Sequence, residues 1–256
     1  MRRTLPHSLG LALVLAWAAA AQQEAPANNP QTVFFKANAH YHEGAYEEAI
    51  RDYSGLVESG VESGNLYFNL GNAYFKLGNI GKAIVNYERA ERLIPADPDL
   101  AANLAYARSS TGAEPCDVPF WRRAVFPLRG RMSTMSLGWL VSAFVTLMFA
   151  TLIAHRLARP QGRVLLYAAG GFALLTFVGG LSLADQLVVD EWPRHAVVVG
   201  ATETPARFEP AEDGTVHFTL PEGTKVQVTE EREGWLQIAR CDGRRGWVPA
   251  AALETL

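Results

Sequence analysis

The sequence predicts a multidomain fold: an all-α domain of repeated helix pairs, then a hairpin of two transmembrane helices, then a small all-β barrel. Three observations predict it. Residues recur at a spacing of 34 in the first half, two long uncharged apolar runs occupy the middle, and the apolar pattern becomes alternating near the C-terminus. The 256 residues carry a net charge of −3, so the composition does not point to nucleic acid as a partner.

The repeat is visible in residue pairs that lie 34 positions apart. These are Asn38 and Asn72, Gly44 and Gly78, Ala49 and Ala83, and Tyr53 and Tyr87, and a partial third copy adds Asn69 and Asn103. A 34-residue period with small and aromatic residues at these steps is typical of tetratricopeptide helix pairs. We therefore expect a tetratricopeptide repeat domain at residues 32–110, in which a fifth helix caps the stack because each pair leaves an apolar face uncovered.

The second copy carries the clearest resemblance. The segment Asn69–Gly78, followed by Ala83, Tyr87 and Pro95, resembles a tetratricopeptide repeat at nearly every signature position. The resemblance implies a domain that binds other proteins in a concave groove lined by the first helix of each repeat.

Four asparagines on these first helices are the predicted protein-binding residues: Asn38, Asn69, Asn72 and Asn103. An asparagine amide both donates and accepts, so a ladder of amides can pair with an extended peptide backbone. In relatives that clamp a C-terminal carboxylate, basic residues occupy positions that here read Phe34, Asp99 and Asn103, so we expect backbone or side-chain recognition instead. The alternative is that these asparagines cap turns or bind water.

Two transmembrane helices are predicted, at residues 132–155 and 164–185. Each supplies the ~20 apolar residues that cross a ~30 Å hydrocarbon core, and neither shows the polar face of a soluble helix. The turn between them, residues 156–163, contains three arginines and is expected in the cytoplasm.

Residues 1–21 have the features of a secretory signal peptide: a basic start, a short apolar core and small residues before Gln22. The alternative is an uncleaved anchor helix. Export of the N-terminal domain would place both terminal domains on the external side of the bacterial inner membrane. Residues 22–31, 111–131 and 186–194 are the expected linkers, and the second contains four arginines near its end that the positive-inside rule would favour in the cytoplasm.

The first span carries small side chains at every fourth position: Gly138, Ser142, Thr146, Ala150 and Ala154. Small residues let helix backbones approach closely in lipid, where there is little hydrophobic drive for association. This stripe either packs the hairpin against itself or forms a helix-packing seam for other membrane helices.

Residues 195–256 are expected to form the barrel, with about five short strands. Val216, Phe218 and Leu220 alternate with polar residues, and Asp242-Gly243 is a hairpin turn signal. The pairs Gly234-Trp235 and Gly246-Trp247 give this region a resemblance to a bacterial SH3-like domain. Trp235 and Trp247 either line a peptide groove or seal the barrel.

The sequence lacks the motifs of a phosphate-binding loop or a nucleophile elbow, and its histidines lack the spacing of metal ligands. We therefore expect no enzyme activity, no metal site and no cofactor. The two cysteines, Cys116 and Cys241, are either unrelated thiols or a single bridge in an oxidising compartment.

The order of signal, tetratricopeptide domain, two spans and SH3-like domain resembles the BatE family, named for the Bacteroides aerotolerance operon. The resemblance implies a membrane-anchored adaptor that works with membrane proteins bearing von Willebrand factor A domains and with a MoxR-type ATPase. The rival hypothesis is a cell-wall sensor whose SH3-like domain binds peptidoglycan.

Overall fold

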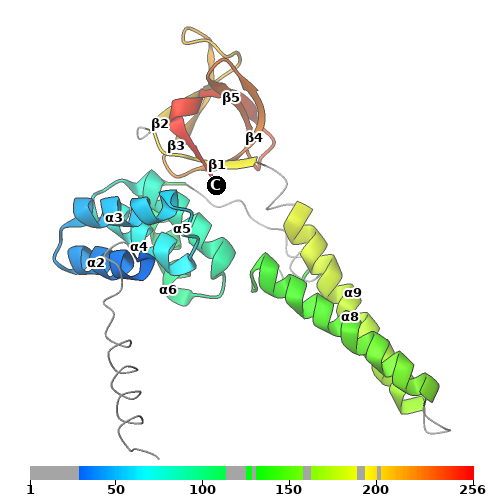
Figure 1. Cartoon of the computed structure of the whole chain (residues 1–256). Coiled ribbons are helices and arrows are strands. Elements are labelled where there is room, and N and C mark those ends of the chain that lie inside the picture. Colours follow the sequence, from blue (N-terminus) through cyan, green and yellow to red (C-terminus); the bar gives the residue numbers. More distant parts are fainter. Residues whose placement is uncertain (1–28, 114–124, 129–130, 158–162, 189–193, 201–202) are drawn as a thin grey trace, which may run out of the picture.

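The computed structural model describes residues 29–113, 125–128, 131–157, 163–188, 194–200 and 203–256. It confirms the predicted fold class, since stacked helix pairs, two long apolar helices and a C-terminal antiparallel sheet follow one another (Figure 1). The predicted signal peptide, residues 1–21, lies outside the described residues. The same holds for residues 22–28, 114–124, 129–130, 158–162 and 189–193 of the predicted linkers and turn.

Five helices build the repeat domain: α2 (Pro30–His42), α3 (Tyr46–Glu58), α4 (Gly64–Lys76), α5 (Ile80–Leu93) and α6 (Pro98–Thr111). Proline occupies the first turn of α2 and of α6, where its missing N–H is not needed. The side chain of Asp97 accepts from the backbone N–H groups of Asp99 and Leu100 and so caps α6. After α2 and α4, Gly44 and Gly78 have φ of +80° and +77°, a conformation that favours glycine.

The repeated small and aromatic residues form the repeat core. Ala49 and its equivalent Ala83 are fully buried, as are Tyr53 and Tyr87, so the 34-residue period marks the contacts between helices. Gly71 is required where α4 meets α5, because a Cβ there would lie 2.7 Å from the Tyr87 ring.

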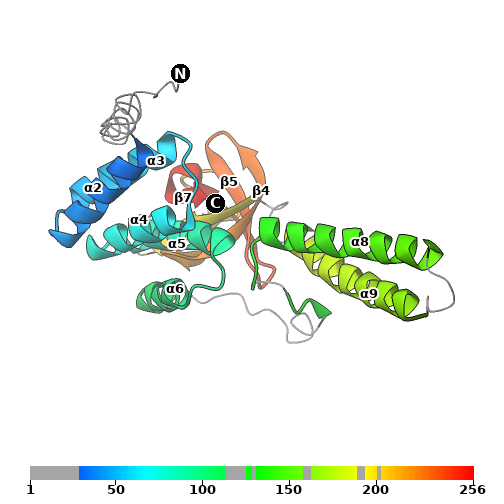
Figure 2. The same cartoon turned by 60° about the horizontal axis from the view of Figure 1, so that its bottom comes forward.

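The two apolar helices, α8 (Thr134–Leu157) and α9 (Arg163–Gln186), form an antiparallel hairpin that extends away from the other two domains (Figures 1 and 2). Both are long and apolar enough to cross a membrane. Leu137 of α8 is fully buried, and the rings of Phe144 and Phe172 stack between the two helices at 6.4 Å.

The C-terminal sheet contains seven strands in the order β3-β2-β6-β5-β4-β1-β7. Their bounds are β1 Arg194–Val198, β2 Glu203–Arg207, β3 Val216–Pro221, β4 Lys225–Arg232, β5 Trp235–Ala239, β6 Arg245–Pro249 and β7 Leu253–Thr255. The prediction of about five strands missed short strands that lack an alternating pattern, such as the three-residue β7. Of the alternating residues that were predicted, Phe218 and Leu220 form part of the barrel core, whereas Val216, at the start of β3, is exposed.

Turns in the barrel lie where glycine signals predict them. Gly223, Gly234 and Gly243 all have positive φ and connect successive strands. Cys241, in the β5–β6 turn, is disulfide-bonded. The sequence contains one other cysteine, Cys116, which lies outside the described residues.

The barrel packs against the outer side of α5, which the sequence did not predict (Figure 2). Val197 of β1 belongs to the same buried cluster as Ile84 of α5, and Leu256 packs against that cluster. The α5 helix has no side-chain cap of its own, and the Glu222 carboxylate of the barrel accepts from the free N–H of Gly81 at 2.6 Å. The barrel therefore completes the N-terminus of a repeat helix.

A buried ionic cluster joins the two domains. Glu88 of α5 is 2% exposed; one carboxylate oxygen accepts from Lys225 of β4 at 2.6 Å, and the other accepts from Arg108 of α6. Burial by itself would raise the pKa of Glu88, but the two cations outweigh this and hold the pKa below its ordinary value of 4.5. Glu88 is thus a buried carboxylate that stays ionised because α6 and the barrel both supply cations.

The depressed pKa of Glu88 predicts acid-sensitive stability. A carboxylate whose pKa is lower in the folded state stabilises the fold above its unfolded pKa, near 4.5. That contribution is lost as the pH falls through the folded-state pKa. Glu88→Gln should lower the free energy of unfolding at pH 7 by about 3 kcal/mol, because two cations lose their buried partner, and should weaken the acid dependence.

Urea unfolding of the detergent-solubilised protein between pH 7 and pH 3, followed by circular dichroism, measures both effects. Glu230→Gln is the matched control, because Glu230 pairs with Arg232 at the surface. A stability difference between wild type and Glu88→Gln that does not shrink at low pH would contradict the assignment.

Candidate functional site: the groove of the helical repeats

The four predicted asparagines lie in two equivalent hydrogen-bonded triads. In the first, the Oδ1 atom of Asn38 accepts from the Tyr53 hydroxyl at 2.5 Å and from Asn69 Nδ2 at 3.0 Å. In the second, every member lies 34 residues later: Asn72 Oδ1 accepts from the Tyr87 hydroxyl at 2.8 Å and from Asn103 Nδ2 at 2.9 Å. Each triad ties the first helix of one repeat to the second helix of that repeat and to the first helix of the next.

The tyrosines of the triads act as donors. Burial raises the pKa of Tyr53 to about 12, and burial also raises the pKa of Tyr87. Both hydroxyls therefore keep their protons at neutral pH and donate to the asparagine oxygen. This arrangement fixes which way each amide points.

The fixed amides leave a defined set of groups for a ligand. Because Asn38 and Asn72 use Oδ1 for two bonds, each keeps its Nδ2 donors, whereas Asn69 and Asn103 donate from Nδ2 and keep an Oδ1 acceptor. All four side chains are half-buried. Each triad thus offers one amide donor group and one amide acceptor, which is the chemistry of a peptide backbone.

A pocket of about 310 Å³ surrounds the second triad. Its lining combines three triad members with three aromatic residues and one lysine: Tyr41, Asn72, Phe75, Lys76, Tyr87, Asn103 and Tyr106. The rings of Phe75 and Tyr106 contact each other at 5.6 Å, and Tyr106 is 65% exposed at the rim. The pocket can therefore take an apolar side chain beside the amide groups.

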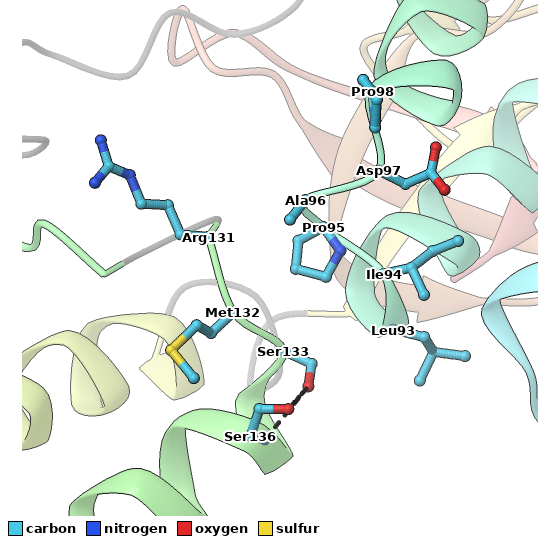
Figure 3. A pocket seen from close by; sticks show the side chains of 10 residues that line it. All are labelled: Leu93, Ile94, Pro95, Ala96, Asp97, Pro98, Arg131, Met132, Ser133 and Ser136. Carbon is cyan, nitrogen blue, oxygen red and sulfur yellow. Dashed lines mark hydrogen bonds between the residues drawn. The ribbon is translucent and has the colours of Figure 1, made fainter.

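A second pocket, of about 500 Å³, lies between the α5–α6 turn and the start of α8 (Figure 3). Its repeat-domain side includes Leu93 and Pro95, and its α8 side includes Arg131 and the hydrogen-bonded hydroxyls of Ser133 and Ser136, 2.9 Å apart. It lacks the paired amides of the groove, so we take the pocket around the second triad as the candidate site.

The two predicted barrel residues lie on adjacent strands. Leu236 and Val248 point into the barrel core, so their neighbours Trp235 and Trp247 project from the opposite face. Trp247 is buried, with the Arg232 guanidinium 5.5 Å from the centre of its ring, and Trp235 is half-buried. A peptide groove at these residues stays a prediction.

The small-residue stripe of α8 lies beside the face that contacts α9. Val141 and Phe144 form that contact face, whereas Ser142, Thr146 and Ala150 are exposed and Gly138 and Ala154 are half-buried. The use of the stripe as a seam for other membrane helices stays a prediction.

Sequence reasoning named the asparagines but missed their partners. Tyr53 and Tyr87 had a signal, because they recur at the same spacing as the asparagines that they bind. Phe75, Lys76 and Tyr106 also had a signal, because they lie three or four residues after Asn72 or Asn103 on the same helix and so share its face. What sequence reasoning missed is that α2, α4 and α6 bring these side chains together around one pocket. Among the residues that the structure describes, no group of three histidine, cysteine or acidic side chains could hold a metal ion.

The triads predict a measurable contribution from each tyrosine hydroxyl. Tyr87→Phe and Tyr53→Phe should each lower the free energy of unfolding by about 1 kcal/mol, because each removes one part-buried hydrogen bond of a buried tyrosine and little volume. Tyr46→Phe is the control, because Tyr46 contacts Tyr41 through its ring and no hydrogen bond of its hydroxyl is found among the described residues. Equal urea midpoints for Tyr87→Phe and Tyr46→Phe would contradict the triad.

Comparison with known proteins agrees with the domain content. Residues 64–97 match the family profile described as Tetratricopeptide repeat, and residues 203–254 match the profile described as Bacterial SH3 domain. No curated protein matches the chain. The first match covers α4, α5 and the turn to α6, which contribute Asn72, Phe75, Lys76 and Tyr87 to the groove pocket, and the second covers most of the barrel.

Proposed function

We propose that this protein is a non-enzymatic, membrane-anchored adaptor that binds an extended segment of a protein partner in the groove of its helical repeats. The observation that carries the proposal is the repeated triad, which holds one amide donor group and one amide acceptor in fixed orientations. A tetratricopeptide repeat supports a protein partner in general terms.

The pocket around the second triad, here called the groove pocket, contains the groups that would bind the partner. Asn72 Nδ2 and Asn103 Oδ1 pair with a backbone carbonyl and N–H of the partner, while an apolar side chain enters between Phe75 and Tyr106. Lys76 at the same pocket favours a partner segment with an acidic residue nearby. Binding energy then comes from a few buried anchors, as is usual at protein interfaces.

The identity of the partner rests on resemblance. The domain order resembles the BatE family, so the partners that we propose are membrane proteins bearing von Willebrand factor A domains, linked to a MoxR-type ATPase. Two candidate membrane spans support a membrane location. The adaptor would then hold its partner at the surface of the bacterial inner membrane.

Contacts between the repeat domain and the barrel support a common side of the membrane for both. Lys225 of the barrel reaches Glu88 of α5, and Arg89 of α5 pairs with Glu254 of β7 at 3.0 Å. Domains that touch in this way are compatible with a hairpin that crosses the membrane twice. The bacterial SH3 match favours the external side.

A second candidate function is cell-wall sensing. Bacterial SH3 domains suit peptidoglycan as a ligand, and half-buried Trp235 on the outer face of β5 is a residue on which a sugar or peptide could stack. In this alternative the barrel binds the wall and the repeats relay the signal.

Tyr106→Ala should abolish recovery of the membrane partner, because the variant removes the exposed wall of the groove pocket. The test is a pull-down of the full-length protein in mild detergent, read by mass spectrometry. Leu93→Ala is the matched control, since it truncates a partly exposed apolar residue in the other pocket. Equal recovery by Tyr106→Ala and wild type would exclude the groove, and recovery of muropeptide material alone would favour the wall sensor.

If both terminal domains lie on the external side of the membrane, alkaline phosphatase should be active when it is fused after Ser110 and after Leu256. A fusion at Gln161, in the predicted cytoplasmic turn, should be inactive. Inactivity of either of the first two fusions would defeat this topology.

A further inference from the structure

We propose that the SH3-like barrel of this protein is a structural support for the repeat groove: by docking on α5 it fixes the capping helix α6 and so keeps the groove pocket formed. The inference builds on the proposed function because α6 carries Asn103 and Tyr106 of that pocket. It assigns the barrel face that contains β1, the β3–β4 turn and β7 to the repeat domain of the same chain.

The first argument is the position of Glu88 between two elements. Its carboxylate binds Arg108 of α6 on one side and Lys225 of the barrel on the other. A buried carboxylate with one cation removed is poorly compensated, so the barrel helps to keep Glu88 ionised and hence keeps α6 attached to α5. Arg108 lies five residues after Asn103 on α6, so the ionic cluster and the groove pocket constrain the same helix.

The second argument is that α5 takes part in both sites through adjacent residues. Tyr87 donates to Asn72 in the groove triad, and Glu88 binds Lys225 of the barrel. Successive residues of a helix point about 100° apart, so one helix presents one face to the groove and another to the barrel. A change in barrel docking therefore reaches the pocket through a single rigid element.

The third argument is the fit at the contact. Gly81 of α5 lies so close to the barrel that a Cβ would be 2.8 Å from the Val198 carbonyl oxygen and 2.9 Å from the Glu222 carboxylate. On the other side, Ile84 of α5 packs directly on Gly223, where the barrel backbone has a positive φ of 80°. Both glycines let the two domains approach more closely than any side chain would allow.

The repeat domain is short for a stack that has to be stable without support from another element. It contains two full helix pairs and one further helix, whereas about three repeats are usual for a stable stack. The barrel covers the α5 face that another element would otherwise have to cover, and Val197 and Leu256 extend the repeat core. In this chain the barrel takes the structural place of a further repeat.

The proposal is tested with Gly81→Ala in the full-length protein, and Gly55→Ala is the matched control. Alanine is the better helix former at both sites, and a Cβ at Gly55 meets nothing within 4 Å, so only Gly81→Ala should interfere with docking. Hydrogen exchange read by mass spectrometry over α6 should be roughly tenfold faster in Gly81→Ala and unchanged in Gly55→Ala. This readout needs no partner, so it is independent of the proposed binding function.

A second pair of variants covers the case in which Gly81→Ala disrupts α5 itself. Lys225→Met removes the barrel cation from Glu88, and Lys36→Met removes an exposed ion pair with Asp52 as its control. The proposal is supported if hydrogen exchange in α6 becomes faster in Lys225→Met and not in Lys36→Met. It is also supported if the repeats and the barrel unfold together in Lys225→Met. Wild-type exchange in α6 together with faster exchange in β1 would overturn it, because the barrel would then detach without effect on the groove.

Discussion

The structure depends on helix α5 being buried on two sides at once. Its inner face packs against α4 through the close contact of Tyr87 with Gly71, and its outer face meets the barrel through Ile84 and Glu88. The ionic cluster around Glu88 is the most demanding part, because a buried carboxylate is stable only while both cations stay in place. The repeats and the barrel are therefore in direct contact, and the hairpin extends away from both.

That constraint explains how so small a repeat domain can present a formed groove. The triads fix the amides of neighbouring repeats, and α6 closes the pocket at one end. The α6 helix packs on α5 through Leu104 and Ala107, and Arg108 adds an ion pair with Glu88, a residue that is in turn shared with the barrel. Barrel docking and groove shape are thus linked by a short series of named contacts.

Local patterns predicted the elements and the residue types of the site. The 34-residue period predicted the helix pairs and the equivalence of Asn38 with Asn72, and glycine signals predicted the barrel turns at Gly234 and Gly243. The docking of the two domains was not predictable in this way. Glu88 and Lys225 are 137 residues apart, and no periodicity relates a helix to a strand in another domain.

The parts of the candidate site also differ in how far local sequence patterns could predict them. The asparagines repeat within one domain and could be named from spacing, whereas the way in which α2, α4 and α6 combine into one pocket depends on how the helices stack. For Trp235 and Trp247, the strand register now shows that they share the face opposite the core. Which of them meets a ligand is a question of surface chemistry that spacing does not address.

Site-specific photocrosslinking in intact membranes tests the central claim most directly. A photoreactive phenylalanine would replace Tyr106 at the groove rim or, in a second variant, Phe208 on the barrel, which are similarly exposed at 65% and 61%. The account predicts that only the Tyr106 variant crosslinks to a membrane protein. Crosslinks from Phe208 alone, to protein or to wall material, would contradict it, because the barrel and not the groove would then be the binding surface.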